Sequence, residues 1–319
     1  MSIIKKKNRI SKYIDKLYFK QWTIGFSRAN LKDVIRTKTF NPDISWVPVK
    51  SFNHFYADPF VYKTRDGNFD IICEDYNFND RYGKIASLTF DQTFKQINHK
   101  IILDTKSHLS YPFIFLENNK IYVFPEAGRS GHLSCYEYVP STKSLIFLQV
   151  IIDLPVVDAT ILNHDNKYWL FGTLRGADSS NKLYLFFSDN LFGPYTPHNN
   201  NPVKNALNGA RPAGNFIEVD GIIYRPSQNS ENRYGESITI HKITVLNEID
   251  FIEEPYMTIS MNKENFCKYG IHTINAADDI IVVDGQIWTF SPLEQLKYFV
   301  KKNVHFSASK RRHYLKNSC

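Results

Sequence analysis

The apolar and polar positions of the chain follow a repeating pattern with a period of about 50 residues. Each copy opens with a polar residue, continues as an apolar strand, turns briefly, and returns as a second strand rich in aromatic residues. The copies begin at Tyr56, Ser110, Val157 and Ala210, and a weaker fifth copy begins at Ile271. A third strand can be drawn after each of the first four hairpins. Units of this length with about four strands are typical of propeller blades.

The polar residues that open the copies set the register of the repeat. Spacings of 53, 47, 53 and 61 residues separate Asp58, Tyr111, Asp158, Arg211 and His272. The turns between the first two strands of the copies contain Asp, Asn and Gly in most cases, which tolerate the backbone angles of tight hairpins. We therefore predict an all-β fold, a single five-bladed β-propeller. A β-sandwich with coincidental spacing is the alternative.

Three parts of the chain differ in charge and pattern. Residues 1–20 carry a charge of +6 and have apolar residues at helical spacing, so we predict a basic amphipathic N-terminal segment. Residues 21–292 form the predicted propeller, and residues 293–319 form a basic C-terminal tail with helical spacing, in which residues 297–319 carry a charge of +7. Short helical extensions of this kind either bind an anionic membrane surface or pack against the propeller rim.

The net charge, the cysteine content and the length of the apolar runs narrow the class of protein further. Residues 1–20 and 297–319 together carry a charge of +13 against a net charge of +7, which leaves −6 for the residues between them, so a nucleic-acid-binding core is disfavoured. The four cysteines form no CxxC pair, and we expect neither a zinc site nor a disulfide framework. No apolar run is long enough to cross a bilayer and no secretory signal is visible. We expect a cytoplasmic protein, peripheral at the inner membrane face if its tails bind lipid.

The repeat also predicts a site. In a propeller the first strand of each blade lines the central axis, so Asp58, Tyr111, Asp158, Arg211 and His272 should converge there. The second strands return to the same end and bring four further polar residues, which are Glu74, Glu126, Thr173 and Ser227. A ring of carboxylate, basic and amide side chains inside an apolar scaffold indicates a sugar-sized polar pocket.

Several short motifs resemble known sugar-active propellers. Ala57-Asp-Pro-Phe, with Asp158 opening the third copy, resembles the propellers of family 43 glycoside hydrolases. The whole set is more similar to the N-terminal domain of glucosamine inositolphosphorylceramide transferases, a domain that also occurs in products of bacterial surface-polysaccharide genes. That set adds Tyr111-Pro-Phe, Pro125-Glu126, Arg211-Pro-Ala-Gly, Tyr224-Arg-Pro-Ser-Gln, Tyr234-Gly235 and Gly270-Ile-His-Thr. Family 43 enzymes place a general-acid Glu where this chain has Arg211, so their hydrolytic mechanism does not carry over intact.

Glycosyl transfer needs one carboxylate as base or nucleophile and one protonated acid. The resemblance implies that Asp58 is the first of these, while Asp158 could shift the pKa of Asp58 by like-charge coupling. Glu126 and Glu74 are the candidate acids. Arg211 suggests an anionic donor or leaving group, and the alternative is that it neutralises an aspartate. The predicted substrate-binding residues are Tyr111, Arg211, Arg225, Gln228, Tyr234, His272 and Asn275.

Three functions remain open at this point. The first is a glycosyltransferase of surface polysaccharide or glycolipid biosynthesis, acting on a sugar or nucleotide sugar with a lipid-linked acceptor. The second is a glycoside hydrolase using Asp58 with Glu126 or Glu74. The third is a non-catalytic sugar-binding propeller that assists a partner transferase. We expect no cofactor and no metal, and we expect Trp169 and Trp288 to lie in the core.

Overall fold

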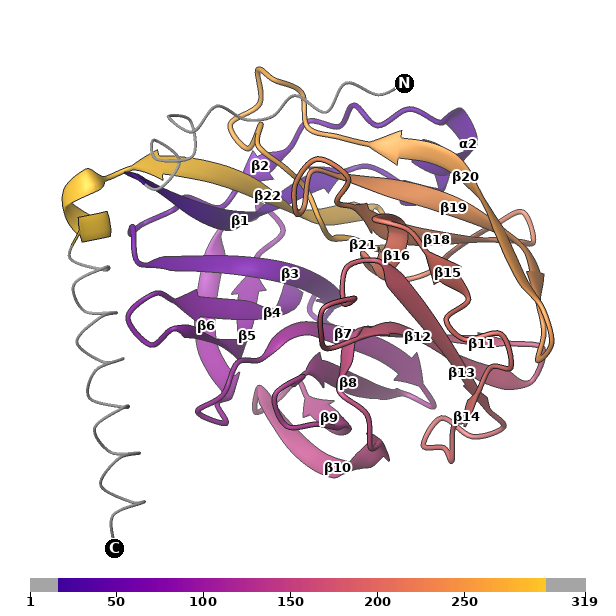
Figure 1. The fold of residues 1–319 in the computed structure, drawn as a ribbon. Helices are drawn as coiled ribbons and strands as arrows, with labels where there is room; N and C mark the ends of the chain where they lie inside the picture. Colours follow the sequence, from indigo (N-terminus) through magenta and orange to yellow (C-terminus); the bar gives the residue numbers. More distant parts are fainter. Residues whose placement is uncertain (1–16, 297–319) are drawn as a thin grey trace, which may run out of the picture.

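Five antiparallel sheets surround a central axis in the computed structural model, which describes residues 17–296 (Figure 1). The prediction of an all-β five-bladed propeller is confirmed. Among the elements with assigned bounds the only helix is the short α2 (Leu31–Thr37), and residues 292–296 begin a second helical segment. None of the helices within residues 17–296 is long and apolar enough to cross a membrane.

Blades 1 to 4 each run outward from the axis in chain order. Blade 1 contains β3 (His54–Lys63), β4 (Phe69–Asn77), β5 (Tyr82–Phe90) and β6 (Gln96–Leu103). Blade 2 contains β7 (Ser110–Glu117), β8 (Lys120–Glu126), β9 (Leu133–Val139) and β10 (Ser144–Ile152). Blade 3 contains β11 (Val156–His164), β12 (Lys167–Leu174), β13 (Lys182–Ser188), β14 (Thr196–Pro197) and β15 (Lys204–Asn205). Blade 4 contains β16 (Asn208–Pro212), β17 (Ile217–Val219), β18 (Ile222–Asn229), β19 (Ser237–Leu246) and β20 (Phe251–Ile259).

Blade 5 is assembled from both ends of the chain. Its inner strands are β21 (Ile274–Ala277) and β22 (Ile280–Phe290), and its outer strands are β1 (Tyr18–Arg28) and β2 (Ser45–Trp46). β1 pairs with β22 in unbroken register along its whole length. This pairing closes the ring and explains why the fifth sequence copy is weak, since half of that blade precedes the first copy.

The predicted N-terminal boundary therefore changes. Residues 18–20 are strand and belong to the propeller, not to an amphipathic helix ending at residue 20. The helical spacing that led to the prediction ends on Leu17 and Tyr18, and pairing with β22 determines the local structure there. Residues 1–16 and 297–319 lie outside the described part of the chain.

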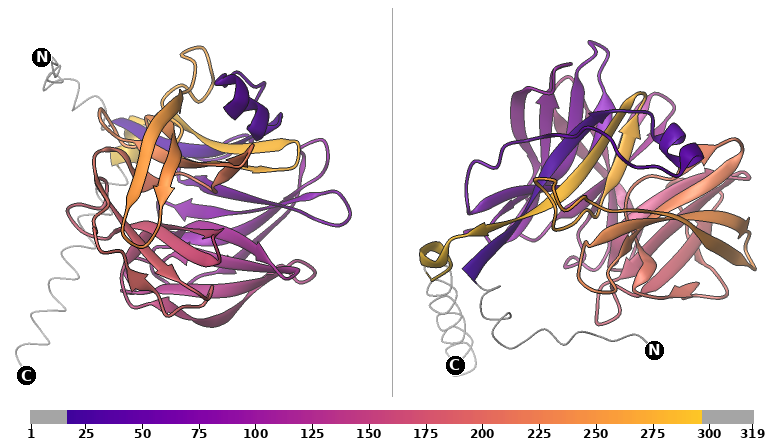
Figure 2. Two further views of the ribbon diagram at one scale, coloured as in Figure 1. Left: turned by 90° about the vertical axis from the view of Figure 1, so that its right-hand side faces the viewer. Right: turned by 90° about the horizontal axis from the view of Figure 1, so that it is seen from above.

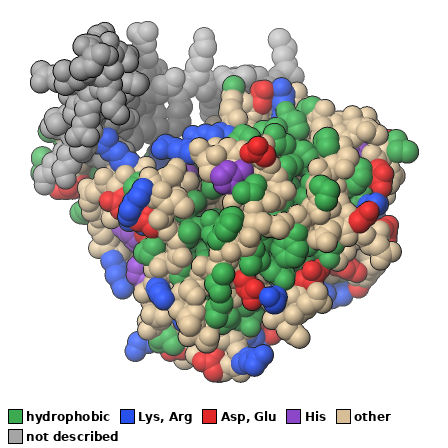
Figure 3. All heavy atoms as spheres, turned by 90° about the horizontal axis from the view of Figure 1, so that it is seen from below, with side chains coloured by type: hydrophobic (Ala, Val, Ile, Leu, Met, Phe, Trp, Pro, Cys, Tyr) green, Lys and Arg blue, Asp and Glu red, His purple; other side chains and the backbone are tan. Residues whose placement is uncertain are grey.

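The core lies between neighbouring blades, where aromatic and aliphatic side chains of facing sheets interlock. Phe60, Phe113 and Phe124 pack between blades 1 and 2 with no more than 1% exposure. α2 covers the outside of blade 4, with Leu31, Val34 and Ile35 against β17 and its neighbours (Figure 2). Apolar side chains also gather on the outer surface seen from below, where β10 exposes a run of residues (Figure 3).

A bulge interrupts the first strand of blades 1, 2 and 3 at the same point. The register shifts between Ala57 and Phe60 in blade 1, and the corresponding shifts occur in β7 and β11. The residues at the bulges, Asp58, Tyr111 and Asp158, have φ of 51°, 40° and 51°. Asp tolerates this left-handed conformation better than most residues, whereas Tyr rarely adopts it. Backbone strain of this kind concentrates at functional sites.

Candidate functional site

Four carboxylates from three blades gather at the end of the ring where the first strands begin, here called the site end. Asp58 and Asp158 come from the bulges, and Glu74 and Glu126 come from the ends of β4 and β8. All four residues are buried, with exposures of 1–6%. Their charges act on one another, since Asp58 and Glu126 both raise the pKa of Glu74. The repeat thus brings together side chains that lie up to 100 residues apart in the sequence.

Asp58 is held by hydrogen bonds from two neighbouring blades. Its Oδ2 accepts from the Tyr111 backbone N–H at 3.2 Å, and its Oδ1 accepts from the Thr273 hydroxyl at 3.0 Å. The His272 Nε2 lies 3.5 Å from the same Oδ1. These contacts fix the carboxylate in one orientation at the axis.

His272 links Asp58 to a second buried carboxylate that the sequence analysis missed, Asp284 of β22. Its Nδ1 lies 2.6 Å from Asp284 Oδ2, and its ring stacks on Trp22 at 3.9 Å between centroids. Burial lowers the pKa of His272, but Asp284 and Asp58 more than offset that effect and raise it. These contacts and the stacking on Trp22 fix the His272 ring as a wall of the site.

The same three residues are the only group that offers clustered metal-ligand atoms within residues 17–296, with Asp58, His272 and Asp284 atoms within 4.8 Å of one another. Protein donors already use most of these atoms. Asp284 accepts from three backbone N–H groups, those of Asp58, His272 and Thr273, each at 3.0 Å. The direct His272–Asp284 contact occupies the space that a cation would need, so an ion pair fits this geometry better than a metal.

Asp158 is paired with Arg211 through two hydrogen bonds, from Nε to Oδ2 and from Nη2 to Oδ1. Gln228 Nε2 also donates to Asp158 Oδ2 at 3.0 Å. Arg211 Nη2 lies 3.8 Å from Glu126 Oε2, and its guanidinium lies 5.3 Å from the centre of the Tyr234 ring. Arg211 therefore neutralises Asp158 and sits beside Glu126.

Two carboxylates have pKa values on opposite sides of neutrality. Burial raises the pKa of Asp58 to about 6, opposed by His272 and assisted by Asp284 and Asp158. Burial and the charge of Asp158 raise the pKa of Glu126 to about 8, although Arg211 opposes the shift. At pH 7 Asp58 is mostly ionised and Glu126 mostly protonated, which is the pairing of a base with an acid.

Three buried polar atoms near this pair have no hydrogen-bond partner among the described residues. They are Glu126 Oε2, Thr173 Oγ1 and Gln228 Oε1, which come from the ends of the second strands of blades 2, 3 and 4. An unpaired buried polar atom costs about 1–3 kcal/mol. Their arrangement at one level of three adjacent blades supplies ready partners for the hydroxyl groups of a ligand.

Two residues that were predicted to bind substrate, Tyr111 and Asn275, instead connect the blades. Tyr111 is fully buried, and its hydroxyl bonds to Thr160 and to the Gly214 N–H, so the side chain fills the axis and joins blades 2, 3 and 4. Asn275 accepts from the Asn215 N–H and donates to the Pro59 carbonyl, which ties blades 4, 5 and 1 together. Both contribute to the scaffold beneath the site.

Arg225 was predicted to bind substrate, but the structure places it away from the site. It lies inside blade 4 with 1% exposure, where it forms a paired contact with Glu253 of β20. Successive side chains of a strand point to opposite faces. Gln228, three positions after Arg225, therefore faces the axis while Arg225 faces the interior of the blade.

Replacing Arg225 with alanine should lower stability without changing ligand binding. The change leaves the Glu253 carboxylate buried with Lys204 as its remaining cationic partner, and breaking a buried ion pair costs about 3–5 kcal/mol. We expect the melting temperature to fall by roughly 10 °C. Arg36→Ala is the matched control, because Arg36 pairs with Asp220 on the exposed surface and its loss should change the melting temperature little. Equal effects of the two variants would contradict this assignment.

His108 is another residue of the site that the pattern did not reveal, because it lies in the connection between blades 1 and 2. Its Nδ1 accepts from the Gly83 N–H at 2.9 Å, so the proton of the neutral ring is on Nε2. Burial, together with the charges of Arg129, Arg175 and Arg211, lowers the pKa of His108 to about 4. Only glycine fits at position 83, where a Cβ would approach Glu74 Oε1 to 2.3 Å.

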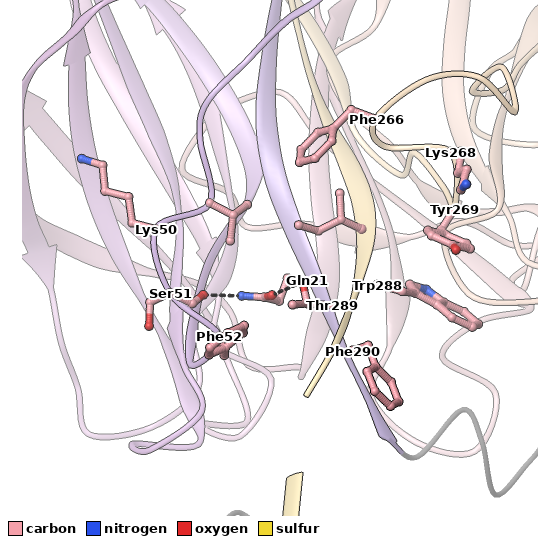
Figure 4. Close-up of a pocket in the computed structure, with 12 residues that line it drawn as sticks. Gln21, Lys50, Ser51, Phe52, Phe266, Lys268, Tyr269, Trp288, Thr289 and Phe290 are labelled. Atoms are coloured by element: carbon pink, nitrogen blue, oxygen red, sulfur yellow. Dashed lines mark hydrogen bonds between the residues drawn. The ribbon is translucent and has the colours of Figure 1, made fainter. Parts of the chain in front are cut away.

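A separate groove of about 600 Å³ lies beside blade 5 (Figure 4). Trp288 and Tyr269 stack at 4.7 Å on one side of it, and the 50–52 segment lies across from them, with Gln21 between and bonded to the Ser51 carbonyl. Trp288 was expected in the core but lines this groove, whereas Trp169 is buried as predicted. The groove is near the site end, because Trp288 follows Asp284 on β22 and Tyr269 precedes His272.

The fold and the site together define a five-bladed propeller with a cluster of buried carboxylates at one end of its axis. The chain belongs to the family described as "Glucosamine inositolphosphorylceramide transferase 1, N-terminal", whose model matches residues 43–279. A glucosamine inositolphosphorylceramide transferase 1 of Arabidopsis thaliana is 33% identical over 213 residues, and one of Oryza sativa subsp. japonica is 31% identical over 211 residues. Each match covers 64% of this chain and 28% of the relative.

Solved structures support the fold alone. A family 117 glycoside hydrolase of Zobellia galactanivorans, Zg3597, matches with a TM-score of 0.53 at 12% identity, covering 86% of this chain and 92% of that chain. CoXyl43, a family 43 β-xylosidase/α-arabinofuranosidase from a compost metagenome, matches with a TM-score of 0.51 at 13% identity, covering 76% and 94%. The resemblance inferred from the motifs is thereby confirmed for both the family and the architecture.

Proposed function

We propose that this chain is a sugar-transfer domain that works in surface polysaccharide or glycolipid biosynthesis and binds its sugar at the axial carboxylates. The observation that carries the proposal is the pair of buried carboxylates with opposite protonation at pH 7, Asp58 and Glu126. Glu126 donates its proton to the leaving oxygen as the glycosidic bond breaks. Asp58 accepts the proton of the incoming hydroxyl as the new bond forms.

The surrounding residues have supporting roles in this proposal. Asp158 contributes to the raised pKa of both Asp58 and Glu126, and hydrogen bonds from Arg211 and Gln228 hold its carboxylate in place. His272 and Tyr234 form the wall on the side of blades 4 and 5. Burial raises the pKa of Glu74 well above its usual range, and we assign this residue a hydrogen-bonding role.

A lipid-linked acceptor at an anionic membrane surface fits the same end of the molecule. The aromatic groove near the site end is bordered by Lys50 and Lys268, and in the sequence the two basic segments precede β1 and follow β22, which pair with each other in blade 5. The relatives are named for transfer to inositolphosphorylceramide, a lipid acceptor. We therefore include peripheral membrane binding on the cytoplasmic side in the proposal.

A second candidate is a non-catalytic sugar-binding domain. Two observations favour it: Arg211 occupies the place of the hydrolase acid, and the chain spans only 28% of the length of the curated relatives that it matches. In that case the remaining part of such a protein would carry out the chemistry and this propeller would hold the sugar.

Incubating the purified protein with a panel of nucleotide sugars separates these functions. Nucleotide release that requires an added glycolipid acceptor supports transfer. Release of free sugar from aryl glycosides without an acceptor indicates a hydrolase. Sugar binding without turnover in either assay would contradict the catalytic proposal and establish the binding domain.

A further inference from the structure

Four loops at the site end, each joining the second and third strands of a blade, contain one arginine apiece. They are Arg81 before β5, Arg129 before β9, Arg175 before β13 and Arg233 before β19. The carboxylate chemistry described above does not use these residues. Their placement at equivalent points of four successive blades puts them around the mouth of the site.

Arg129 and Arg175 approach the same part of that mouth. The position of a Cβ on Gly128 would lie 3.4 Å from Arg175 Cδ and Nη1 and 3.6 Å from Glu126 Oε1. The Arg175 side chain therefore crosses the turn of the neighbouring blade, directly beside the candidate acid. Both arginines and Arg211 also act electrostatically on His108, which places the three guanidinium groups around one imidazole.

These two arginines lack a counterion. No hydrogen bond or ion pair within residues 17–296 engages either side chain, and both residues are exposed. The nearest carboxylates do not supply one, because Asp158 is taken by Arg211, and burial raises the pKa of Glu126 to about 8 and that of Glu74 above its usual range. The mouth therefore has an excess of positive charge above a floor that offers unpaired polar atoms on Glu126, Thr173 and Gln228.

We propose that the site binds a sugar that carries a phosphate ester, with the sugar on the carboxylate floor and the phosphate oxygens against Arg129 and Arg175. A guanidinium binds phosphate through two parallel hydrogen bonds. A carboxylate offers only two acceptor oxygens, which one guanidinium group can occupy. Phosphate offers more, so it can bind two guanidinium groups from different loops, and it fits this arrangement better than the carboxylate of a uronic acid. The inference rests on the proposed function for the sugar, and adds the class of the ligand.

Two kinds of ligand could present such a phosphate to the arginines: the diphosphate of a nucleotide-sugar donor, or the phosphodiester headgroup of a lipid acceptor. Inorganic pyrophosphate probes the first, and glycerophosphoinositol probes the second. Glucuronate tests a carboxylate in place of phosphate. Binding of any of these can be measured calorimetrically on the intact chain at two salt concentrations.

We expect the native protein to bind at least one phosphate probe more tightly than glucuronate, and more weakly at high salt. Arg129→Ala combined with Arg175→Ala should weaken that binding by about 30-fold or more, as expected for the loss of charge-assisted contacts. Arg65→Ala is the matched control, an exposed arginine in the β3–β4 turn at the opposite end of the ring, and should bind like the native chain. Melting curves show whether the double variant folds.

The inference is overturned if the native protein binds neither phosphate probe, if glucuronate binds more tightly, or if the double variant binds like Arg65→Ala. Its failure can be told from that of the proposed function. Phosphate binding that depends on the two arginines, without turnover of any sugar, would leave the inference standing and remove the catalytic proposal. Sugar turnover that is unchanged in the double variant would support the catalytic proposal and overturn the phosphate site.

Discussion

Replacing Asp58 with asparagine should reduce sugar transfer by about 10³-fold or more, because the carboxylate proposed as the base is lost, and Asp158 cannot replace it since it is paired with Arg211. Asparagine keeps the shape of the side chain. Its oxygen can still accept from the Tyr111 N–H, and its amide can donate to the Thr273 hydroxyl. The fold should therefore survive, and a melting curve can verify this.

Asp278→Asn is the control for this variant. Asp278 lies in the β21–β22 turn, is exposed, and pairs with Lys63 on the surface. Its turnover should match that of the native chain. If Asp58→Asn retains native turnover while folded, Asp58 is not the base, and the catalytic account is wrong.

The dependence of kcat/KM on pH should be bell-shaped, with limbs near pH 6 and pH 8. Below about pH 6 Asp58 gains a proton and cannot act as the base, and above about pH 8 Glu126 loses the proton that it must donate. Glu126→Gln should lower the rate by about 10²–10⁴-fold and remove the alkaline limb, while the acidic limb stays in place.

Glu137→Gln provides the comparison for the pH experiment, since Glu137 pairs with Lys120 on the outside of blade 2. Its profile should overlay that of the native chain. A native rate that is constant from pH 5 to pH 9, or an alkaline limb that persists in Glu126→Gln, would show that Glu126 is not the acid.

The repeating part of the fold is predictable from the sequence because each blade is closed by local turns. Asp, Asn and Gly at most of the hairpins, and polar residues at the bulges, give four copies in one register. The fifth blade is different, because β1 and β22 are paired across more than 250 residues and no local signal joins them. The helical spacing up to Tyr18 was misleading for the same reason, since long-range pairing overrides a local preference there.

The site was predictable only as a group of polar residues at a shared level of the blades. Polarity identified Asp58, Asp158, Glu74 and Glu126, but it could not show which polar side chains are used by the scaffold. Tyr111 fills the axis and Arg225 pairs with Glu253, and both contacts are set by tertiary packing. His108 lies in a connection outside the repeat, and Asp284 belongs to the weakest copy, so neither had a pattern to reveal it.

The buried polar groups at the site end lower the stability of the fold. Residues that are kept despite such a cost indicate a function. Asp58 and Tyr111 adopt left-handed backbone angles, several carboxylates are desolvated together, and three polar atoms have no partner among residues 17–296. A scaffold under selection for stability alone would fill the axis with apolar side chains. A ligand that satisfies the unpaired atoms of Glu126, Thr173 and Gln228 would relieve part of this cost.

A crystal structure of the Asp58→Asn protein soaked with a nucleotide sugar would show directly where the sugar binds. We expect the sugar ring at the site end of the axis, within hydrogen-bond distance of residue 58 and of the Glu126 carboxyl group. A sugar bound only in the groove of Trp288 and Tyr269, with the axial carboxylates out of its reach, would contradict the assignment of this site.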